Sequence, residues 1–313
     1  GPEFGPFFLC KSFKWPYLGT KSQYIAAMIY FTLILFPMIC FASIFGVDDR
    51  QEYYEIKDPQ IKELSKSSAA LMYKNRLQRL PNGDYKIKAK SLKDGYQFCA
   101  DAAFSEQGQV ANCSGALISK DQVLTAAHCI DLDKGPQKDI EKLYVVFDYK
   151  RLKDALIETV PQENVFEIQK VEHFEFDRTL SKSTLDLAII KLNRPANRPI
   201  AELDLNHQYN EGLPLFVLGY PLGVALKLGD NSALSLSPQN NSFRHELDTF
   251  SVNSGRPIFD AETYKVIGVY VRGTGRNYYK EGRECNDWFR GKLGSDYGEA
   301  NTLGSLKGLL PFL

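Results

Sequence analysis

Short apolar runs rich in β-branched and aromatic residues recur along the chain, and they constrain its fold more than any other feature. Gly, Pro, Asn and Asp separate these runs, which is the pattern of strands joined by turns. An all-β barrel or sandwich is therefore expected. The runs are ALIS from Ala116, KLYVVFDY from Lys142, NVFEIQKVEHF from Asn164, LAIIKL from Leu187, LPLFVLGYP from Leu213 and KVIGVYVRG from Lys265.

Three segments place a histidine, an aspartate and a serine in apolar or glycine-bearing surroundings. They are TAAHC with His128, TLDLAIIKL with Asp186 and DTFSVNSGRP with Ser254. Nucleophilic acyl transfer needs a hydroxyl, a base that takes its proton and a buried carboxylate that orients the base. A carboxylate in so apolar a run needs a partner, because burying it unpaired is costly. These three residues are therefore candidates for the base, the carboxylate and the nucleophile.

The segment CSGALISKDQVLTAAHC at residues 113–129 resembles the strand and loop that carry the catalytic histidine in chymotrypsin/trypsin-like serine peptidases. LDLAIIKL is similar to the aspartate segment of that family, and NSG at residues 253–255 is similar to its nucleophile turn. Residues 248–250, DTF, point to the bacterial glutamyl-endopeptidase-like branch. The order His, Asp, Ser is also that of chymotrypsin-like enzymes. The resemblance extends from about residue 47 to about residue 293.

The resemblance implies a chymotrypsin-like double six-stranded β-barrel behind an N-terminal hydrophobic signal or anchor helix. We expect a short amphipathic helix at residues 60–72 and the start of a crossover between the barrels at residues 193–199. The expected division is 1–20 for an expression scar and basic region, 21–46 for a signal peptide or membrane anchor, 47–90 for a propeptide or N-terminal extension, 91–200 for the first barrel with His128 and Asp186, 201–300 for the second barrel with Ser254, and 301–313 for a tail.

Residues 24–45 are almost wholly apolar, with lysines before them and Asp48 and Asp49 after them. Basic residues on the N-terminal side favour a cytoplasmic N-terminus and export of the chain beyond the apolar segment. The length suits a membrane anchor, whereas Pro37 and the small residues near Ala42 favour a cleaved signal peptide. We expect an exported protein, secreted or periplasmic, with a membrane-anchored form as the alternative.

Six cysteines are present, and two of them, Cys10 and Cys40, lie in or before the apolar segment. Spacing and the family resemblance together pair Cys113 with Cys129. The pair Cys99–Cys285 then remains for the folded part. Disulfides agree with export, and four reduced thiols in a cytosolic protein are the alternative. No CxxC or HExxH spacing indicates a metal site.

The nucleophile turn departs from the family pattern at two positions. The resemblance assigns the oxyanion hole to the backbone N–H groups of Val252 and Ser254, but the family normally has glycine where Val252 stands. A β-branched residue restricts the backbone there. Arg256 replaces a small residue two positions after the nucleophile. These departures favour, as an alternative to an active enzyme, a pseudoprotease that uses the cleft as a binding module.

The resemblance places Asp248, Thr249, Tyr270 and Arg272 in the substrate pocket. Asp248 stands six residues before the serine, where trypsin-like enzymes carry the carboxylate that pairs with Lys or Arg. Tyr270 takes the place of the pocket histidine of glutamyl endopeptidases, and Arg272 stands where trypsins have tryptophan. On balance these residues favour a basic residue before the scissile bond.

Acidic and basic residues both number 38, which gives a formal net charge of zero and no overall field that would favour nucleic acid. The sequence therefore predicts an exported serine endopeptidase that forms a Ser254 acyl-enzyme, with His128 as general base and Asp186 orienting it. Its partner is a protein or peptide substrate, with possible membrane anchoring through residues 24–45. No cofactor or metal is expected, and a monomer is favoured.

Overall fold

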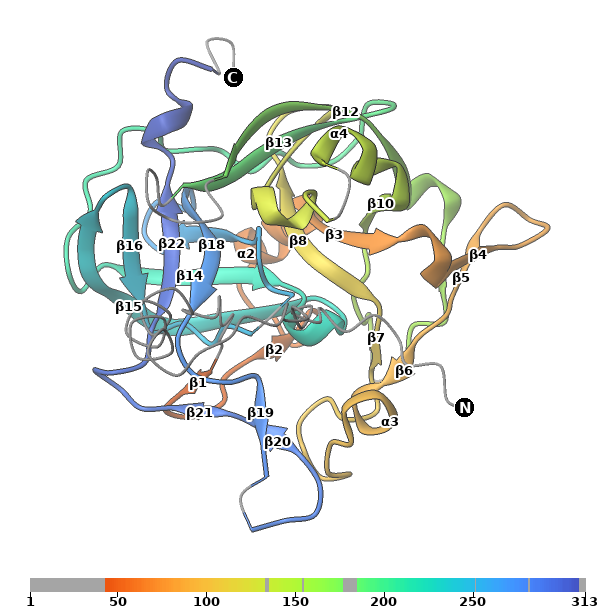
Figure 1. Ribbon diagram of the computed structural model, residues 1–313, viewed down its shortest axis with the longest axis horizontal. Coiled ribbons are helices and arrows are strands. Elements are labelled where there is room, and N and C mark those ends of the chain that lie inside the picture. Colours follow the sequence, from red (N-terminus) through yellow and green to blue (C-terminus); the bar gives the residue numbers. More distant parts are fainter. Residues whose placement is uncertain are drawn as a thin grey trace, which may run out of the picture. The chain divides into compact units, whose positions relative to one another are not determined.

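The structure, a computed structural model, describes residues 43–132, 135–153, 155–176, 185–250, 252–280 and 282–309. Two β-barrels dominate the described residues (Figure 1). This architecture confirms the predicted all-β, chymotrypsin-like fold. The predicted signal peptide or anchor lies outside the described residues except for its last few positions, 43–46. Within the described residues, no helix has the length and apolar character needed to cross a bilayer.

The first barrel is closed in the strand order β10-β12-β13-β9-β8-β3. Its most apolar strands are buried almost throughout, as expected of strands that line a core. Strand β12 is mostly buried over residues 165–168 and more exposed over the rest of its length. The strands are β3 (Ser68–Tyr73), β8 (Ala111–Leu117), β9 (Gln122–Thr125), β10 (Leu143–Phe147), β12 (Val165–Phe176) and β13 (Asp186–Leu192).

The second barrel follows the order β14-β17-β18-β22-β16-β15, and pairing of β14 with β15 closes it. One further strand, β2 (Gln51–Glu52), pairs with the outer side of β15. The barrel strands are β14 (Pro214–Gly219), β15 (Lys227–Gln239), β16 (Ser242–His245), β17 (Pro257–Asp260), β18 (Val266–Gly273) and β22 (Gly298–Thr302).

Shorter elements decorate the two barrels. The small sheets pair β1 (Ile44–Phe45) with β21 (Arg290–Gly291), β4 (Leu77–Arg79) and β11 (Thr159–Val160) with β5 (Tyr85–Ile87), β6 (Lys90–Ser91) with β7 (Gly108–Gln109), and β19 (Tyr278–Tyr279) with β20 (Asp287–Trp288). The α-helices are α2 (Pro59–Leu64), α3 (Leu92–Tyr96) and α4 (Pro136–Asp139). The 3₁₀ turns are η1 (Ser65–Ser67), η2 (Lys74–Arg76), η3 (Ala127–Cys129), η4 (Ile140–Lys142), η5 (Gln162–Asn164), η6 (Pro221–Gly223) and η7 (Gly304–Leu306).

The expectation that residues 47–90 form a propeptide or extension is wrong for β3, which is an integral strand of the first barrel. This strand pairs with β8 on one side and with β10 on the other, and removing it would open the barrel. The helix expected at residues 60–72 is correspondingly short. It ends with α2 at Leu64, because the residues that follow η1 enter the barrel wall.

Both predicted disulfides are present. Cys113–Cys129 joins β8 to η3 across 16 residues, beside the candidate histidine, and closing such a loop stabilises a fold by roughly 3 kcal/mol. Cys99–Cys285 joins residues 186 positions apart. This second bridge lies among aromatic side chains that enclose Arg50, whose guanidinium carbon is 3.9 Å from the Trp288 ring centroid.

Candidate active site

His128 and Asp186 meet because the strands that carry them are neighbours. β13 pairs with β9, His128 lies in the turn η3 that follows β9, and Asp186 is the first residue of β13. The Asp186 carboxylate contacts His128 twice: Oδ2 lies 2.6 Å from Nδ1, and Oδ1 accepts the backbone N–H at 2.9 Å. With Nδ1 protonated, this arrangement fixes the ring and turns Nε2 outward. The two residues thus have the geometry of a base and its orienting carboxylate.

The surroundings of His128 favour its protonated form. Burial by itself disfavours the imidazolium, but the charge of Asp186 and its hydrogen bond outweigh burial, so the pKa of His128 is raised above its ordinary value. The Arg272 guanidinium acts in the opposite direction. The His128 side chain keeps 25% of its surface exposed, whereas that of Asp186 keeps 3%. A partly exposed imidazole above a buried carboxylate can exchange protons with a bound molecule.

Asn301 supports the aspartate from the second barrel. Its side-chain Oδ1 accepts the Asp186 backbone N–H at 2.7 Å, and Asn301 is fully buried. Sequence reasoning missed this residue, since no motif marks it. The contact also shows that the position of Asp186 depends on both barrels.

Ser254 lies at the junction of the barrels, against the segment that carries His128. Its carbonyl accepts the Ser114 N–H at 2.8 Å and lies 3.6 Å from Cys129 Sγ. The next residue, Gly255, has φ +84°, and a Cβ there would lie 2.2 Å from the Ser114 oxygen and 2.8 Å from the Ala126 nitrogen. Only glycine permits this approach, which brings the serine close to the backbone just before His128. Among the described residues, no hydrogen bond joins Ser254 Oγ to His128, and such bonds often tighten only when substrate binds.

Val252 adopts the conformation that glycine would take at this position. Its φ is +74°, and the N–H of Asn253 donates to the Phe250 carbonyl at 2.9 Å. A positive φ at the third residue of such a turn is typical of type II turns, which favour glycine there. In the described part of the chain, neither the Val252 N–H nor the Ser254 N–H donates a hydrogen bond. Among the described residues, both N–H groups assigned to the oxyanion hole thus have no hydrogen-bond acceptor.

The pocket region contains a segment of the chain itself. Ser43 forms two backbone hydrogen bonds with Thr249, of 2.7 and 3.2 Å, and the Phe45 N–H donates to Asp248 Oδ1 at 2.8 Å. Asp248 is only 4% exposed, and burial raises its pKa to about 7. Asp248 is therefore not an exposed carboxylate that could bind the basic residue expected before the scissile bond. Sequence reasoning missed Ser43 and Phe45 because they end an apolar run that resembles a membrane segment.

Tyr270 and Arg272 lie on β18, beside the nucleophile turn. Tyr270 is buried, and the guanidinium carbon of Arg256 lies 5.6 Å from its ring centroid. Arg272 is partly exposed and donates through Nε and Nη2 to Glu299 Oε1, at 3.0 and 2.7 Å. Tyr270 therefore packs into the barrel, whereas Arg272 pairs with Glu299 at the border of the solvent.

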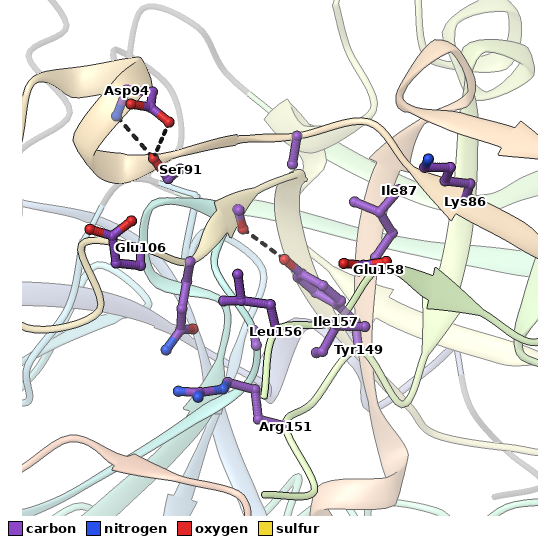
Figure 2. Close-up of a pocket in the computed structure, with 14 residues that line it drawn as sticks. Lys86, Ile87, Ser91, Asp94, Glu106, Tyr149, Arg151, Leu156, Ile157 and Glu158 are labelled. Carbon is purple, nitrogen blue, oxygen red and sulfur yellow. Dashed lines mark hydrogen bonds between the residues drawn. The ribbon is translucent and has the colours of Figure 1, made fainter. Parts of the chain in front are cut away.

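A separate cavity of about 420 Å³ lies away from these residues (Figure 2). Its lining includes Tyr149, Arg151, Leu156 and Glu158, and no predicted site residue contributes to it. The cavity is therefore distinct from the candidate active site.

The sulfurs of Cys113 and Cys129 and one ring nitrogen of His128 lie within 4.8 Å of one another. Because the two sulfurs form a disulfide, they have no thiolate to offer a metal ion.

A family model and two solved structures are similar to this chain. The model of the trypsin-like peptidase domain matches residues 113–269, a range that contains His128, Asp186 and Ser254. A solved structure of the VesB protease of Vibrio cholerae aligns with a TM-score of 0.50 and 16% identity, over 85% of this chain and 67% of that chain. A Glu endopeptidase solved in complex with MPD aligns with a TM-score of 0.48 and 15% identity, over 85% of this chain and 97% of that chain.

Proposed function

The chain belongs to the trypsin-like peptidase domain family of serine endopeptidases, and we propose that it hydrolyses peptide bonds through an acyl-enzyme on Ser254. The observation that carries the proposal is the two-point contact between His128 and Asp186. The approach of the Ser254 turn to the same segment, enforced at Gly255, supports it.

In the proposed mechanism His128 Nε2 takes the proton of Ser254 Oγ while that oxygen attacks the peptide carbonyl. Asp186 keeps the imidazole in the tautomer that leaves Nε2 free and stabilises the imidazolium. The negative charge on the carbonyl oxygen would be received by the N–H groups of Val252 and Ser254. The imidazolium then protonates the leaving amine. In the second stage water takes the place of the amine: His128 accepts a proton from water as it attacks the ester carbonyl, and returns it to Ser254 Oγ as the acid product leaves.

We further propose that the enzyme acts outside the cytoplasm. Two disulfides in one domain agree with an oxidising compartment. The pairing of Ser43 and Phe45 with the pocket region limits where a signal peptide could be removed, because cleavage beyond Phe45 would take away the donor to Asp248. Processing before Ser43 and retention as an anchor are both compatible with this contact.

A binding module without turnover is the second candidate, and the Ser43–Phe45 segment against the pocket residues favours it. A fluorophosphonate probe separates the two candidates, because the probe reacts only with a serine activated by its base. The full chain, produced under oxidising conditions, should be labelled, whereas S254A and H128A should not. A folded wild-type chain that is not labelled would contradict the enzyme and favour the binding module. Labelling that persists in S254A would show that another residue is the nucleophile.

A further inference from the structure

Strand β18 runs directly beside the nucleophile turn. The Gly255 N–H donates to the Tyr270 carbonyl at 2.8 Å, and the Tyr270 N–H donates to the Arg256 carbonyl at 3.0 Å. Between Tyr270 and Arg272 the pairing of β18 with β22 shifts register. Such bulges turn the following side chain to a new direction. The shift explains why Tyr270 is buried in the barrel whereas Arg272 is partly exposed.

The charge of Arg272 acts on the candidate base. Burial and the Arg272 guanidinium both lower the pKa of His128, against the raising influence of Asp186. Strand pairing gives the geometry: Arg272 lies opposite Glu299, two residues before Asn301, whose side chain accepts the Asp186 N–H at 2.7 Å. Arg272 therefore lies on a strand that adjoins the nucleophile turn and pairs with the strand that supports Asp186.

Glu299, on β22, holds this guanidinium. The hydrogen bonds from Nε and from Nη2 share the single oxygen Oε1. The Arg272 and Glu299 side chains keep 20% and 19% of their surfaces exposed, so the pair lies at the border of the solvent. Arginine presents five donors in a planar fork suited to carboxylates. A second carboxylate arriving from solvent could therefore compete with Glu299 for Arg272.

We propose that Arg272 forms an anion-selective subsite beside His128, and that Glu299 competes with the substrate for Arg272. The subsite prefers Asp or Glu at the substrate residue immediately before the residue whose carbonyl is attacked. This inference rests on the proposed function, because it assumes a peptide held between Ser254 and β18. It names a preference that is independent of the buried pocket around Asp248.

The test uses three peptide substrates that differ only at that position, with Asp, Asn or Lys. A charge-assisted hydrogen bond at a partly exposed site predicts kcat/KM about tenfold higher for Asp than for Asn, and lower still for Lys. R272M should bring the Asp/Asn ratio to about one. E299Q should raise the ratio, because the competing carboxylate is gone. R79M is the matched control: Arg79 is an exposed residue of β4, in the small sheet β11-β5-β4.

A pH profile separates this role from a merely structural one. Removing the positive charge should raise the pKa of His128, so the acid limb of kcat/KM should move to higher pH in R272M but not in R79M. If R272M folds poorly, R272Q gives the same comparison. An Asp/Asn ratio unchanged by loss of Arg272, or equal to one in the wild type, would overturn the inference. If the wild type is not labelled by the fluorophosphonate, the proposed function itself fails, which is a different result.

Discussion

Replacing Val252 by glycine tests whether the oxyanion hole is already formed in this chain. The φ of +74° places Val252 in the left-handed region. That conformation costs a residue with a Cβ roughly 1–2 kcal/mol, and it costs glycine almost nothing. Glycine can raise kcat/KM only by recovering the fraction of wild-type chains that leave this conformation to escape the strain, so the strain sets an upper limit on the gain. Because about 1.4 kcal/mol corresponds to a factor of ten in rate, V252G should raise kcat/KM by no more than about 30-fold.

The assay compares V252G with two matched variants on one soluble peptide ester. V252A keeps a Cβ but removes the branching, so it should fall between the wild type and V252G. V252P removes the N–H donor and fixes φ near −65°, and the loss of one such donor predicts a fall of about 10²–10³ in kcat. Titration with a fluorophosphonate gives the concentration of reactive serine, so each rate is expressed per active site.

Two results would refute this reasoning. A gain of about 10² or more in V252G would mean that the wild-type hole lacks a donor, because strain relief alone cannot supply so much. Unchanged activity in V252P would mean that the Val252 N–H plays no part. Either outcome would mean that the observed backbone conformation of Val252 does not provide a working oxyanion-hole donor.

Three further changes have expected outcomes. D186N should lower kcat/KM by about 10⁴ and, since Asp186 raises the pKa of His128, should move any remaining acid limb to lower pH; a limb that moves upward would contradict this pairing. Replacing both Cys99 and Cys285 by serine should lower the free energy of unfolding in urea by roughly 3–5 kcal/mol, and a loss below about 1 kcal/mol would show that the bridge does not restrain the unfolded chain. Burial raises the pKa of Asp248 to about 7, above its unfolded value, so the contribution of Asp248 to wild-type stability should fall by about 1.4 kcal/mol per pH unit between about pH 4 and pH 7. D248N should remove this slope in pH-dependent melts, and an identical slope would contradict the assignment.

The sequence predicted those features whose signals are local. A few residues mark each of the segments whose side chains, His128 and Asp186, meet in the structure, and the apolar runs lie in strands of the two barrels. The disulfide pairing also followed from spacing and family resemblance. In these places local propensity and the final fold agree.

Strand β3 could not be predicted in this way. Its sequence, SAALMY, is rich in residues that favour helices, and the amphipathic pattern before it suggested that a helix continues. Ala69 and Ala70 are fully buried because β8 and β10 flank them on both sides. Pairing with strands distant in the sequence decided the conformation, as is common for β structure.

The residues around Ser43 illustrate a second limit. Ile44 is 1% exposed within the cluster that includes Phe250 and Trp288. An apolar residue that enters a protein core has the same character in the sequence as one that enters a bilayer. The apolar pattern extends the predicted membrane-like segment to residue 46, whereas Ser43 already pairs with Thr249 in the fold.

The second departure in the nucleophile turn also has a structural place. Arg256 is 2% exposed, and its Nη2 donates to the Asp248 carbonyl at 2.7 Å, which ties the two ends of the turn together. A Cβ on Gly219 would lie 2.8 Å from Arg256 Cδ, so the long side chain fits because that neighbour is glycine. Arg256 and Gly219 thus pack against each other beside the turn, and Val252 adopts a positive φ, which glycine favours. The turn therefore accommodates both departures from the family pattern, and the Ser43–Phe45 segment against the pocket residues is the feature that favours an inactive chain.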